Sequence, residues 1–223
     1  MKFESGIFEP IVHHYTSNFG DIEMWMRNVF DFFNRHPEVR KHVHSVKYRL
    51  KDPAHLQEKL QRKWDAENPI TPDNLFERIT DLAGVRVLLL HQQQFTKLKE
   101  LIDARLQRRE WHLIEEPKAY TWDPEAKIFF EGLGYTVHFK PSFYTSLHYI
   151  IKQYEESPYA CEIQVRTLFE EIWGEVDHSI NYPQQTQDIG CRDQIMVLAK
   201  LIGAGSRLVD SIFSAHESSK TKK

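Results

Sequence analysis

The chain has little cysteine and no long apolar run, and both absences exclude whole classes of protein. It contains two cysteines, Cys161 and Cys191, in 223 residues, and no CxxC pair. A disulfide framework and a zinc site of that spacing are therefore excluded, and a reducing compartment is the simplest setting. The N-terminus, Met1 to Ser5, has no apolar signal segment, and no apolar run approaches membrane-spanning length. We expect a cytoplasmic protein without a membrane partner.

Several signatures of nucleotide and ester chemistry are also absent. There is no GxxxxGK[ST] segment, so the chain is not a P-loop NTPase, and its two Gly-x-Gly segments do not extend to GxGxxG. An adjacent His-Asp dyad, typical of one class of metal-dependent phosphohydrolases, does not occur, and neither does GxSxG. Nucleotide chemistry in this chain therefore needs another arrangement of side chains.

The composition is that of an ordinary globular protein, with 41% hydrophobic and 27% charged residues. The formal net charge is −3, so a site for polyanions must come from local clusters of cations rather than from the whole molecule. The length allows one full core, or one core with a helical annex.

Hydrophobic periodicity predicts helices at both ends of the chain and strands between them. We expect helices over residues 7–35 (with a break at Gly20), a short one after Pro37, one that begins at Pro53, and others over 94–108, 168–180 and 191–213. Strands are predicted over residues 44–50, 84–90, 145–153 and 160–166. The most apolar strand, 84–90, is expected at the centre of the sheet.

The segment 111–140 gives a weaker signal, because its aromatic residues lie among charges, prolines and glycines. Trp111 to Ile114 is a candidate strand, but we interpret the segment as a long, aromatic-rich excursion outside the core. Alternating helices and strands indicate a mixed α/β or α+β class with helices at both ends of one sheet. We divide the chain into an N-terminal helical segment (1–43), a core (44–183), and a C-terminal helix with a polar tail (184–223).

The strand at 160–166 has an unusual second face. Its odd-numbered residues are apolar, whereas the other face carries a carboxylate, an amide and a guanidinium, on Glu162, Gln164 and Arg166. Alternate side chains are roughly 7 Å apart, about the reach of a metal–phosphate group. Thr167 and Glu170 then form a capping box that begins a helix. The alternative is an ordinary exposed strand face.

Cations cluster between residues 47 and 63. Lys47, Arg49 and Lys51 share a strand face, and Lys59 and Lys63 share a helix face beside Arg62. Cations at this spacing suit a triphosphate, because like charges repel unless an anion lies between them. The alternative is a solvated basic surface.

Asp81 precedes the most apolar strand, and Arg86 lies within that strand. A carboxylate at a strand end is a common Mg²⁺ ligand, and Mg²⁺ prefers a few carboxylates together with phosphate oxygens. A charge inside an apolar strand needs a partner or a cavity. The alternative is therefore a structural ion pair between Asp81 and Arg86.

The segment from Lys140 to His148 brings an aromatic ring and an imidazole together. If it is extended, Tyr144, Ser146 and His148 point the same way. A tyrosine ring offers a stacking surface for a base, and a histidine offers a hydrogen-bond donor. The alternative is a contact within the core.

Taken in chain order, these motifs resemble the synthetase domain of the RelA/SpoT alarmone family, over residues 47–182. The residues that carry the resemblance are Tyr48-Arg49-Leu50-Lys51 with Lys59, Arg62 and Lys63; Ile79-Thr80-Asp81-Leu82-Ala83-Gly84-Val85-Arg86; Tyr144-Thr145-Ser146-Leu147-His148; and Glu162-Ile163-Gln164-Val165-Arg166-Thr167 with Trp173 and Asp177-His178-Ser179. The long C-terminal helix resembles that of the small, single-domain alarmone synthetases.

The resemblance implies a nucleotidyltransferase-like mixed β-sheet flanked by helices. It also implies an ATP-dependent pyrophosphokinase, which transfers the β,γ-pyrophosphate of ATP to the ribose 3′-hydroxyl of GDP or GTP and makes (p)ppGpp-type alarmones. By motif matching, Asp81 and Glu162 hold Mg²⁺, Glu162 also draws the proton from the attacking hydroxyl, and Gln164 supports the site.

The same matching assigns the substrate contacts. ATP and its phosphates are expected to contact Arg49, Lys51, Lys59, Arg62 and Arg86. Tyr144 is expected to stack on the acceptor base, and Lys140 and His148 to contact acceptor phosphates.

Two features depart from the family pattern and bear on the acceptor. Many guanosine-nucleotide synthetases of the family carry an asparagine where this chain has Glu171, which we assign to the acceptor site. The excursion at 111–140 leads into the strand predicted at 145–153, which carries His148 of the expected acceptor site. Both leave open a toxin of the same fold that acts on adenosine nucleotides or on the tRNA 3′-end, with an antitoxin as partner.

A tRNA acceptor would need an added basic surface. The candidates are Arg105, Arg108, Arg109, Lys118, Lys220, Lys222 and Lys223. An alternative of another class is a catalytically silent regulator that binds nucleotides or RNA. The apolar stripe of the helix at 191–213 either packs on its own domain or binds a second copy as a homo-oligomer.

Overall fold

The computed structural model describes residues 6–182 and 184–221. Its centre is a seven-stranded mixed sheet in the order β1-β2-β7-β6-β4-β5, with β3 paired to β6 outside this path. The strands are β1 Ser45–Leu50, β2 Ala83–Leu89, β3 His112–Leu113, β4 Lys118–Thr121, β5 Thr136–Phe139, β6 Ser146–Lys152 and β7 Ala160–Thr167. The predicted class, a mixed sheet flanked by helices and with helices at both ends of the chain, is confirmed.

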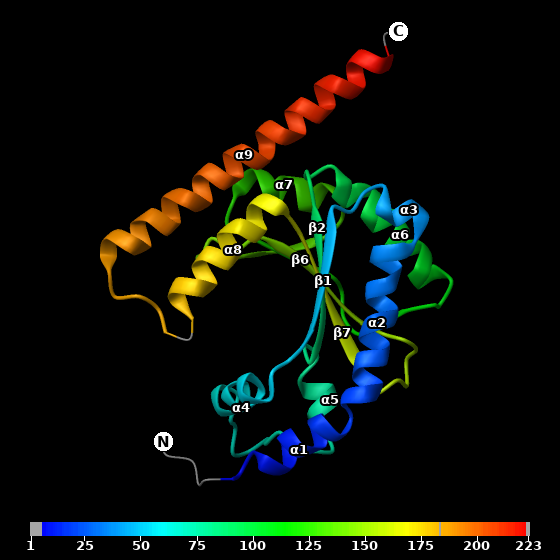
Figure 1. Cartoon of the computed structure of the whole chain (residues 1–223), viewed down its shortest axis with the longest axis vertical. Coiled ribbons are helices and arrows are strands. Elements are labelled where there is room, and N and C mark those ends of the chain that lie inside the picture. The colour runs from blue at the N-terminus through cyan, green and yellow to red at the C-terminus, as the bar shows by residue number, and fades with distance from the viewer. Residues whose placement is uncertain (1–5, 183, 222–223) are drawn as a thin grey trace.

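Helices cover both faces of the sheet (Figure 1). They are α1 Glu9–Ser17, α2 Phe19–Arg35, α3 Pro37–Arg40, α4 Pro53–Arg62, α5 Leu75–Arg78, α6 Gln94–Gln107, α7 Pro124–Gly132, α8 Leu168–Asn181 and α9 Ile189–Thr221. Near β1, β2 and β7, α2 lies on one side of the strands, and α4 and α8 lie on the other. No helix in the described part of the chain is both long and apolar enough to cross a membrane.

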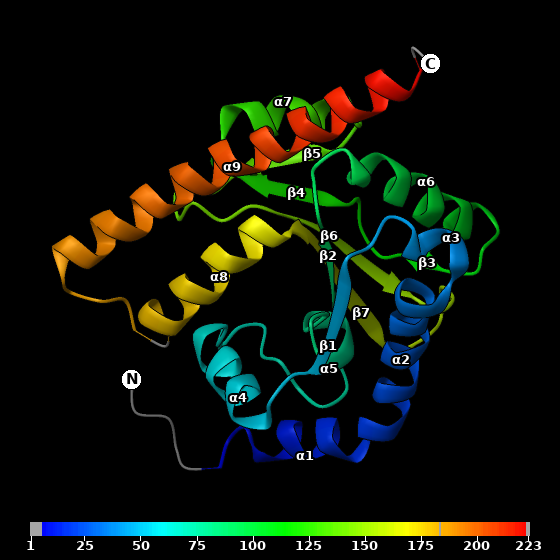
Figure 2. The same ribbon diagram turned by 45° about the horizontal axis from the view of Figure 1, so that its top comes forward.

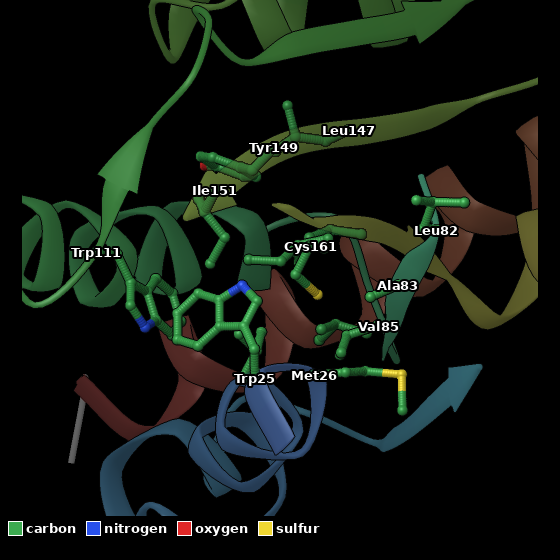
Figure 3. Close-up of a cluster of buried hydrophobic side chains, with 14 of the residues drawn as sticks. Trp25, Met26, Leu82, Ala83, Val85, Trp111, Leu147, Tyr149, Ile151 and Cys161 are labelled. Atoms are coloured by element: carbon green, nitrogen blue, oxygen red, sulfur yellow. The ribbon is translucent and has the colours of Figure 1, made fainter. Parts of the chain in front are cut away.

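The apolar faces of β2 and β7 form the main core against α2. Figure 3 shows Trp25 and Met26 of α2 pointing at Val85 and Cys161. All four side chains are buried, and Cys161 and Cys191 are both free thiols. Cys161 is fully buried, so it is an apolar core residue, and the same burial raises the pKa of its thiol. The second faces of the same strands are thereby turned toward α4 and α8.

The strand at 84–90 does not lie at the centre of the sheet, so the prediction of a central position is wrong. It forms β2, which lies next to the edge strand β1, while β7 and β6 occupy the middle of the sheet. Its apolar sequence reflects burial at the faces of the sheet, with Val85, Val87 and Leu89 on one face and Leu88 on the other, rather than a central position. The remaining strands come from the segment that we had placed outside the core.

That segment, 111–140, is part of the fold. It contributes β3, β4, α7 and β5, and Trp111, Phe130 and Tyr135 are buried in the main core. The strands of two to four residues are too short to show a period-2 pattern. The turn residues that suggested a loop begin α7: the Asp123 side chain accepts from the Glu125 N–H, and Pro124 occupies the first turn.

The first helical segment breaks at Asn18 rather than at Gly20. Asn18 leaves the helical conformation and donates its side-chain amide to the His14 carbonyl, while Gly20 lies inside α2. The resulting bend places Tyr15 in the core, where its hydroxyl donates to the Lys51 carbonyl at 2.7 Å. The N-terminal helices thus support the end of β1.

The C-terminal helices form a second layer (Figure 2). Trp173 of α8 packs with Ile195, Ala199 and Ile202 of α9 in a small separate cluster. One face of α9 therefore packs on its own domain. Its opposite face exposes Leu201 and other apolar residues, and self-association through that face stays a prediction.

The hydrophobic periodicity that predicts the helix at 168–180 corresponds only in part to a buried face. Trp173 is buried, but Ile172 and Ile180 are exposed. The reason is that α8 packs on α9 by one narrow stripe and turns the buried carboxylate Glu171, not an apolar residue, toward the polar face of the sheet.

Candidate active site

Polar side chains from four strands lie in rows on one face of the sheet. Because side chains alternate along a strand, the register decides which of them are neighbours. In the first row, Arg49 and Glu162 lie on either side of Gly84, and the second row is Lys47, Arg86, Gln164 and His148. The strand face singled out at residues 160–166 thus continues across the sheet.

Two adjoining pockets open over these rows. The first is a cavity of about 160 Å³, and its lining includes Lys47, Arg49, Asp81, Arg86, Glu162 and Gln164. The second is an open pocket of about 380 Å³ lined by Tyr120, Lys140, Ser142, Tyr144, His148, Glu162, Trp173 and Asp177. We call them the cationic pocket and the aromatic pocket. Glu162 lines both.

Asp81 is held by two lysines at the edge of the cationic pocket. Lys51 Nζ lies 3.0 Å from Oδ2, and Lys59 Nζ lies 2.6 Å from Oδ1. Burial opposes ionisation of Asp81, but the charges and hydrogen bonds of both lysines outweigh it and lower its pKa. The alternative ion pair between Asp81 and Arg86 is wrong, because Arg86 contacts Glu171 and Glu175 instead.

Glu162 is oriented by two neighbours in the sheet. His148 Nδ1 lies 3.0 Å from Oε1, and Gln164 Nε2 donates to Oε2 at 2.7 Å. Since an ionised carboxylate only accepts, His148 donates through Nδ1, and its Nε2 meets the Tyr144 hydroxyl at 2.9 Å. Burial opposes ionisation of Glu162, yet the interactions with His148 and the hydrogen bond from Gln164 together outweigh it and lower its pKa. Glu162 is thus an ionised, fixed acceptor between the two pockets.

Glu171 lies away from both linings and is 5% exposed. It contacts Lys47 at 2.8 Å, Arg86 at 3.0 Å and Arg166 at 3.3 Å. Burial opposes its ionisation, but the Lys47 hydrogen bond and the two arginine charges lower its pKa. The carboxylate is therefore occupied by protein cations, and a contact with the acceptor stays a prediction.

Of the remaining residues predicted from the sequence, some lie at the two pockets and one, Arg62, lies away from them. Lys59 reaches Asp81, whereas Arg62, three residues later in α4, is exposed and lines neither pocket. Lys140 lies over the Tyr120 ring, with Nζ 4.5 Å from the ring centroid. Lys140, Tyr144 and His148 therefore share the aromatic pocket.

Several residues of the site had no individual role assigned from the sequence, although most of them belong to the motifs quoted for the family resemblance. Tyr120 packs edge-on against His148, with ring centroids 4.9 Å apart, but its strand is too short for periodicity to reveal. Trp173 and Asp177 are one helical turn apart, and that i, i+4 spacing was a usable signal that they share a face. Arg166 belongs to the polar strand face noted in the sequence, but its contacts with Tyr144 and Glu171 arise only through the fold.

Comparisons with known proteins agree with this architecture. No curated protein matches significantly. Among solved structures, a GTP pyrophosphokinase family protein from Streptococcus pneumoniae is similar at 20% identity and a TM-score of 0.63, covering 100% of this chain and 99% of that chain. Small alarmone synthetase 1 from Bacillus subtilis is similar at 19% identity and a TM-score of 0.64, covering 96% and 100%.

The same Bacillus subtilis enzyme, bound to its product pppGpp, matches at 18% identity and a TM-score of 0.58, covering 94% of this chain and 96% of that chain. At these identities the structural likeness shows the fold. The family model described as the region found in RelA / SpoT proteins matches residues 48–187, well over half of the chain. The chain therefore belongs to the RelA/SpoT family.

Proposed function

We propose that this chain is a Mg²⁺-dependent pyrophosphokinase that transfers the β,γ-pyrophosphate of ATP to the 3′-hydroxyl of a guanosine nucleotide. The observation that carries the proposal is the position of Glu162 between a pocket of cations and a pocket of aromatic residues. Family membership supports it, and so does the similar Bacillus subtilis enzyme that is bound to pppGpp. The two free cysteines fit a cytoplasmic enzyme.

The cationic pocket suits the triphosphate of ATP. Lys47, Arg49 and Arg86 line it, and Lys51 and Lys59 adjoin it through Asp81. Anionic oxygens between these cations would relieve their mutual repulsion, and arginine can bind two phosphate oxygens at once. Binding of ATP would therefore draw Lys51 and Lys59 from Asp81 toward the phosphates.

The donor set fits a magnesium ion shared with the substrate. Asp81 and Glu162 line one cavity, and the described residues contain no cluster of three or more acidic, histidine or cysteine ligands. Mg²⁺ commonly binds one or two carboxylates and completes its shell with phosphate oxygens and water. When bound, it would neutralise charge on the transferred pyrophosphate.

Glu162 is the proposed general base. The acceptor 3′-hydroxyl loses its proton to Glu162 as its oxygen attacks the β-phosphorus of ATP. The new bond joins the 3′-oxygen to that phosphorus, the bond from the β-phosphorus to the bridging α,β-oxygen breaks, and AMP leaves with that oxygen. His148 and Gln164 fix both carboxylate oxygens, so the base is oriented before the acceptor arrives.

The aromatic pocket suits the base and the phosphates of a guanosine nucleotide. The Tyr144 ring offers a stacking surface, and Lys140 supplies a cation. Asp177 lines the same pocket, and its Oδ1 accepts from Asn181 at 2.7 Å, which leaves the second oxygen for a ligand. Guanine offers a neighbouring ring N–H and amino group to such an acceptor. We therefore assign to Asp177 the reading of the base.

The deciding experiment is incubation with γ-labelled ATP and separate acceptors: GDP, GTP, ADP and bulk tRNA. We expect labelled product with GDP or GTP when Mg²⁺ is present and none in excess chelator. Absence of transfer to every acceptor would overturn the proposal and favour the silent regulator. Transfer to ADP or tRNA alone would keep the chemistry and replace the acceptor.

Two of the basic residues considered for a tRNA acceptor are paired within the protein. Among the candidate basic residues, Arg105 stacks over Phe32 and pairs with Glu110, and Lys118 pairs with Glu115. Lys222 and Lys223 lie outside the described residues. Arg105 and Lys118 are therefore compensated by protein carboxylates, and a tRNA acceptor stays a prediction.

A further inference from the structure

Arg166 contacts one lining residue of each pocket, Gln164 and Tyr144, and is almost wholly buried, with 4% of its surface exposed. Its Nη2 atom is 3.2 Å from the Tyr144 hydroxyl and donates to Gln164 Oε1 at 3.0 Å. Its guanidinium carbon also lies 5.2 Å from the centroid of the Tyr144 ring. Arg166 thus holds the tyrosine by its hydroxyl and by its ring.

Glu171 balances the charge of Arg166. The Glu171 Oε2 atom lies 3.3 Å from Arg166 Nη1, and no other carboxylate forms an ion pair with this arginine in the described part of the chain. A buried guanidinium is costly without such a partner. The position of Arg166, and with it that of Tyr144, therefore depends on how Glu171 is shared.

Glu171 is shared with the cationic pocket. Its Oε1 atom accepts from Lys47 at 2.8 Å and from Arg86 at 3.0 Å, and both cations line that pocket. One buried carboxylate therefore joins the cations proposed for ATP to the arginine that holds the stacking tyrosine.

The position of the Arg166 guanidinium also requires a glycine at residue 174 of α8. A Cβ atom added to Gly174 would lie 2.7 Å from Arg166 Nη1, closer than real contacts allow. The guanidinium would have to move, although no charge would change. Gly174 thus gives a way to disturb Arg166 that leaves Glu171 intact.

We propose that Glu171 and Arg166 are positioning residues that couple the ATP pocket to the acceptor pocket. Triphosphate oxygens compete with Glu171 for Lys47 and Arg86. Glu171 then pairs more fully with Arg166, which fixes the Tyr144 ring for stacking. Because coupling is reciprocal, each substrate tightens the binding of the other by the same factor. This inference rests on the proposed function, since it takes ATP and a guanosine nucleotide as ligands.

The test is titration calorimetry of GDP with and without a non-hydrolysable ATP analogue, in Mg²⁺. For the wild type we expect the analogue to lower the Kd of GDP by about 5- to 10-fold, within the usual range of coupling between sites. Glu171→Gln should reduce the factor to about 1. Gly174→Ala should reduce it as well, because it displaces Arg166, and its thermal unfolding shows whether the fold is retained.

Glu175→Gln is the matched control. Glu175 lies on the same helix and contacts Arg86 at 2.9 Å, but it is exposed and forms no ion pair with Arg166. Its amide should keep the wild-type factor.

Two results would overturn the inference and leave the proposed function standing: a wild type that binds both ligands independently, or Glu171→Gln and Gly174→Ala proteins that couple them as the wild type does. A wild type that binds neither ligand and transfers no label would overturn the proposed function itself.

Discussion

Lys59 Nζ lies 2.6 Å from Asp81 Oδ1, so a cation that we assign to ATP occupies the carboxylate that we assign to magnesium. Together with Lys51, it balances the charge of a largely buried acid. Because Asp81 lines the cationic pocket, both lysines lie at the edge of that pocket and can contact a triphosphate bound there. Asp81 therefore has a protein partner without substrate and, in our proposal, a metal partner with it.

Asp81→Asn tests the metal assignment. An amide ligates Mg²⁺ more weakly than a carboxylate, so we expect turnover to fall by about 10²-fold or more and the dependence on Mg²⁺ to shift to higher concentration. The measurement is label transfer across a Mg²⁺ titration. Asp31→Asn, an exposed change on α2 that removes an ion pair with Arg35, should leave both unchanged. Undiminished turnover in Asp81→Asn would remove Asp81 from the metal site.

Glu162→Gln tests the general base. The amide oxygen can still accept from His148, but it cannot take a proton at neutral pH, so kcat should fall by about 10²- to 10⁴-fold. Affinity for a non-hydrolysable ATP analogue, measured by calorimetry, should change much less than kcat. Glu77→Gln, an exposed change on α5, serves as the control. A Glu162→Gln enzyme with wild-type kcat would show that another group removes the proton.

Asp177→Asn tests how the base is read. The amide keeps an acceptor for Asn181 but presents an amino group to the guanine donors, which it would repel. We expect the preference for GDP over IDP, which lacks the 2-amino group, to fall by about 5- to 10-fold, the value of one good hydrogen-bonded contact. The comparison of kcat/KM for the two acceptors measures this, with Asp193→Asn on α9 as control. An unchanged preference would assign the reading of guanine to another residue.

The sequence predicted best what short-range patterns encode. The alternation at residues 160–166 and the cap at Thr167 give β7 and the start of α8 as expected. Asp81 and Glu162, which motif matching assigns to one metal ion, line one cavity because β2 and β7 are neighbouring parallel strands. In contrast, β4 and β5 have four residues each, too few to show a period-2 pattern, and the three cations around Glu171 meet only in the folded chain. Local periodicity carries no record of such contacts.

Acid should weaken the contribution of Glu171 to stability. The Lys47 hydrogen bond and the arginine charges lower its pKa below the ordinary value of 4.5 in spite of burial. A carboxyl group with a lowered pKa stabilises the fold above its unfolded pKa and loses this contribution as the pH falls through the folded pKa. The difference in unfolding free energy between wild type and Glu171→Gln should therefore be largest near neutral pH and shrink below pH about 4.5.

Urea unfolding at several pH values measures this difference. Glu175→Gln, which changes an exposed carboxylate on the same helix, should give a small difference at every pH. If the difference for Glu171→Gln stayed constant or grew in acid, the carboxylate would not be ionised in the fold.

Phe130 and Phe139 test whether the segment 111–140 belongs to the core. Phe130 of α7 is 1% exposed and packs edge-on against Phe95 with ring centroids 5.3 Å apart, whereas Phe139 at the end of β5 is 72% exposed. Phe130→Ala should lower the free energy of unfolding by about 3–5 kcal/mol, because it leaves a cavity among packed rings. Phe139→Ala should change it by about 0.5 kcal/mol or less.

Urea denaturation at neutral pH measures both values. Since neither side chain lines a pocket of the proposed site, the folded fraction of each variant should keep its kcat. Equal, small effects of the two substitutions would mean that α7 does not pack on the sheet in solution, and the aromatic segment would be the peripheral excursion that its sequence suggests.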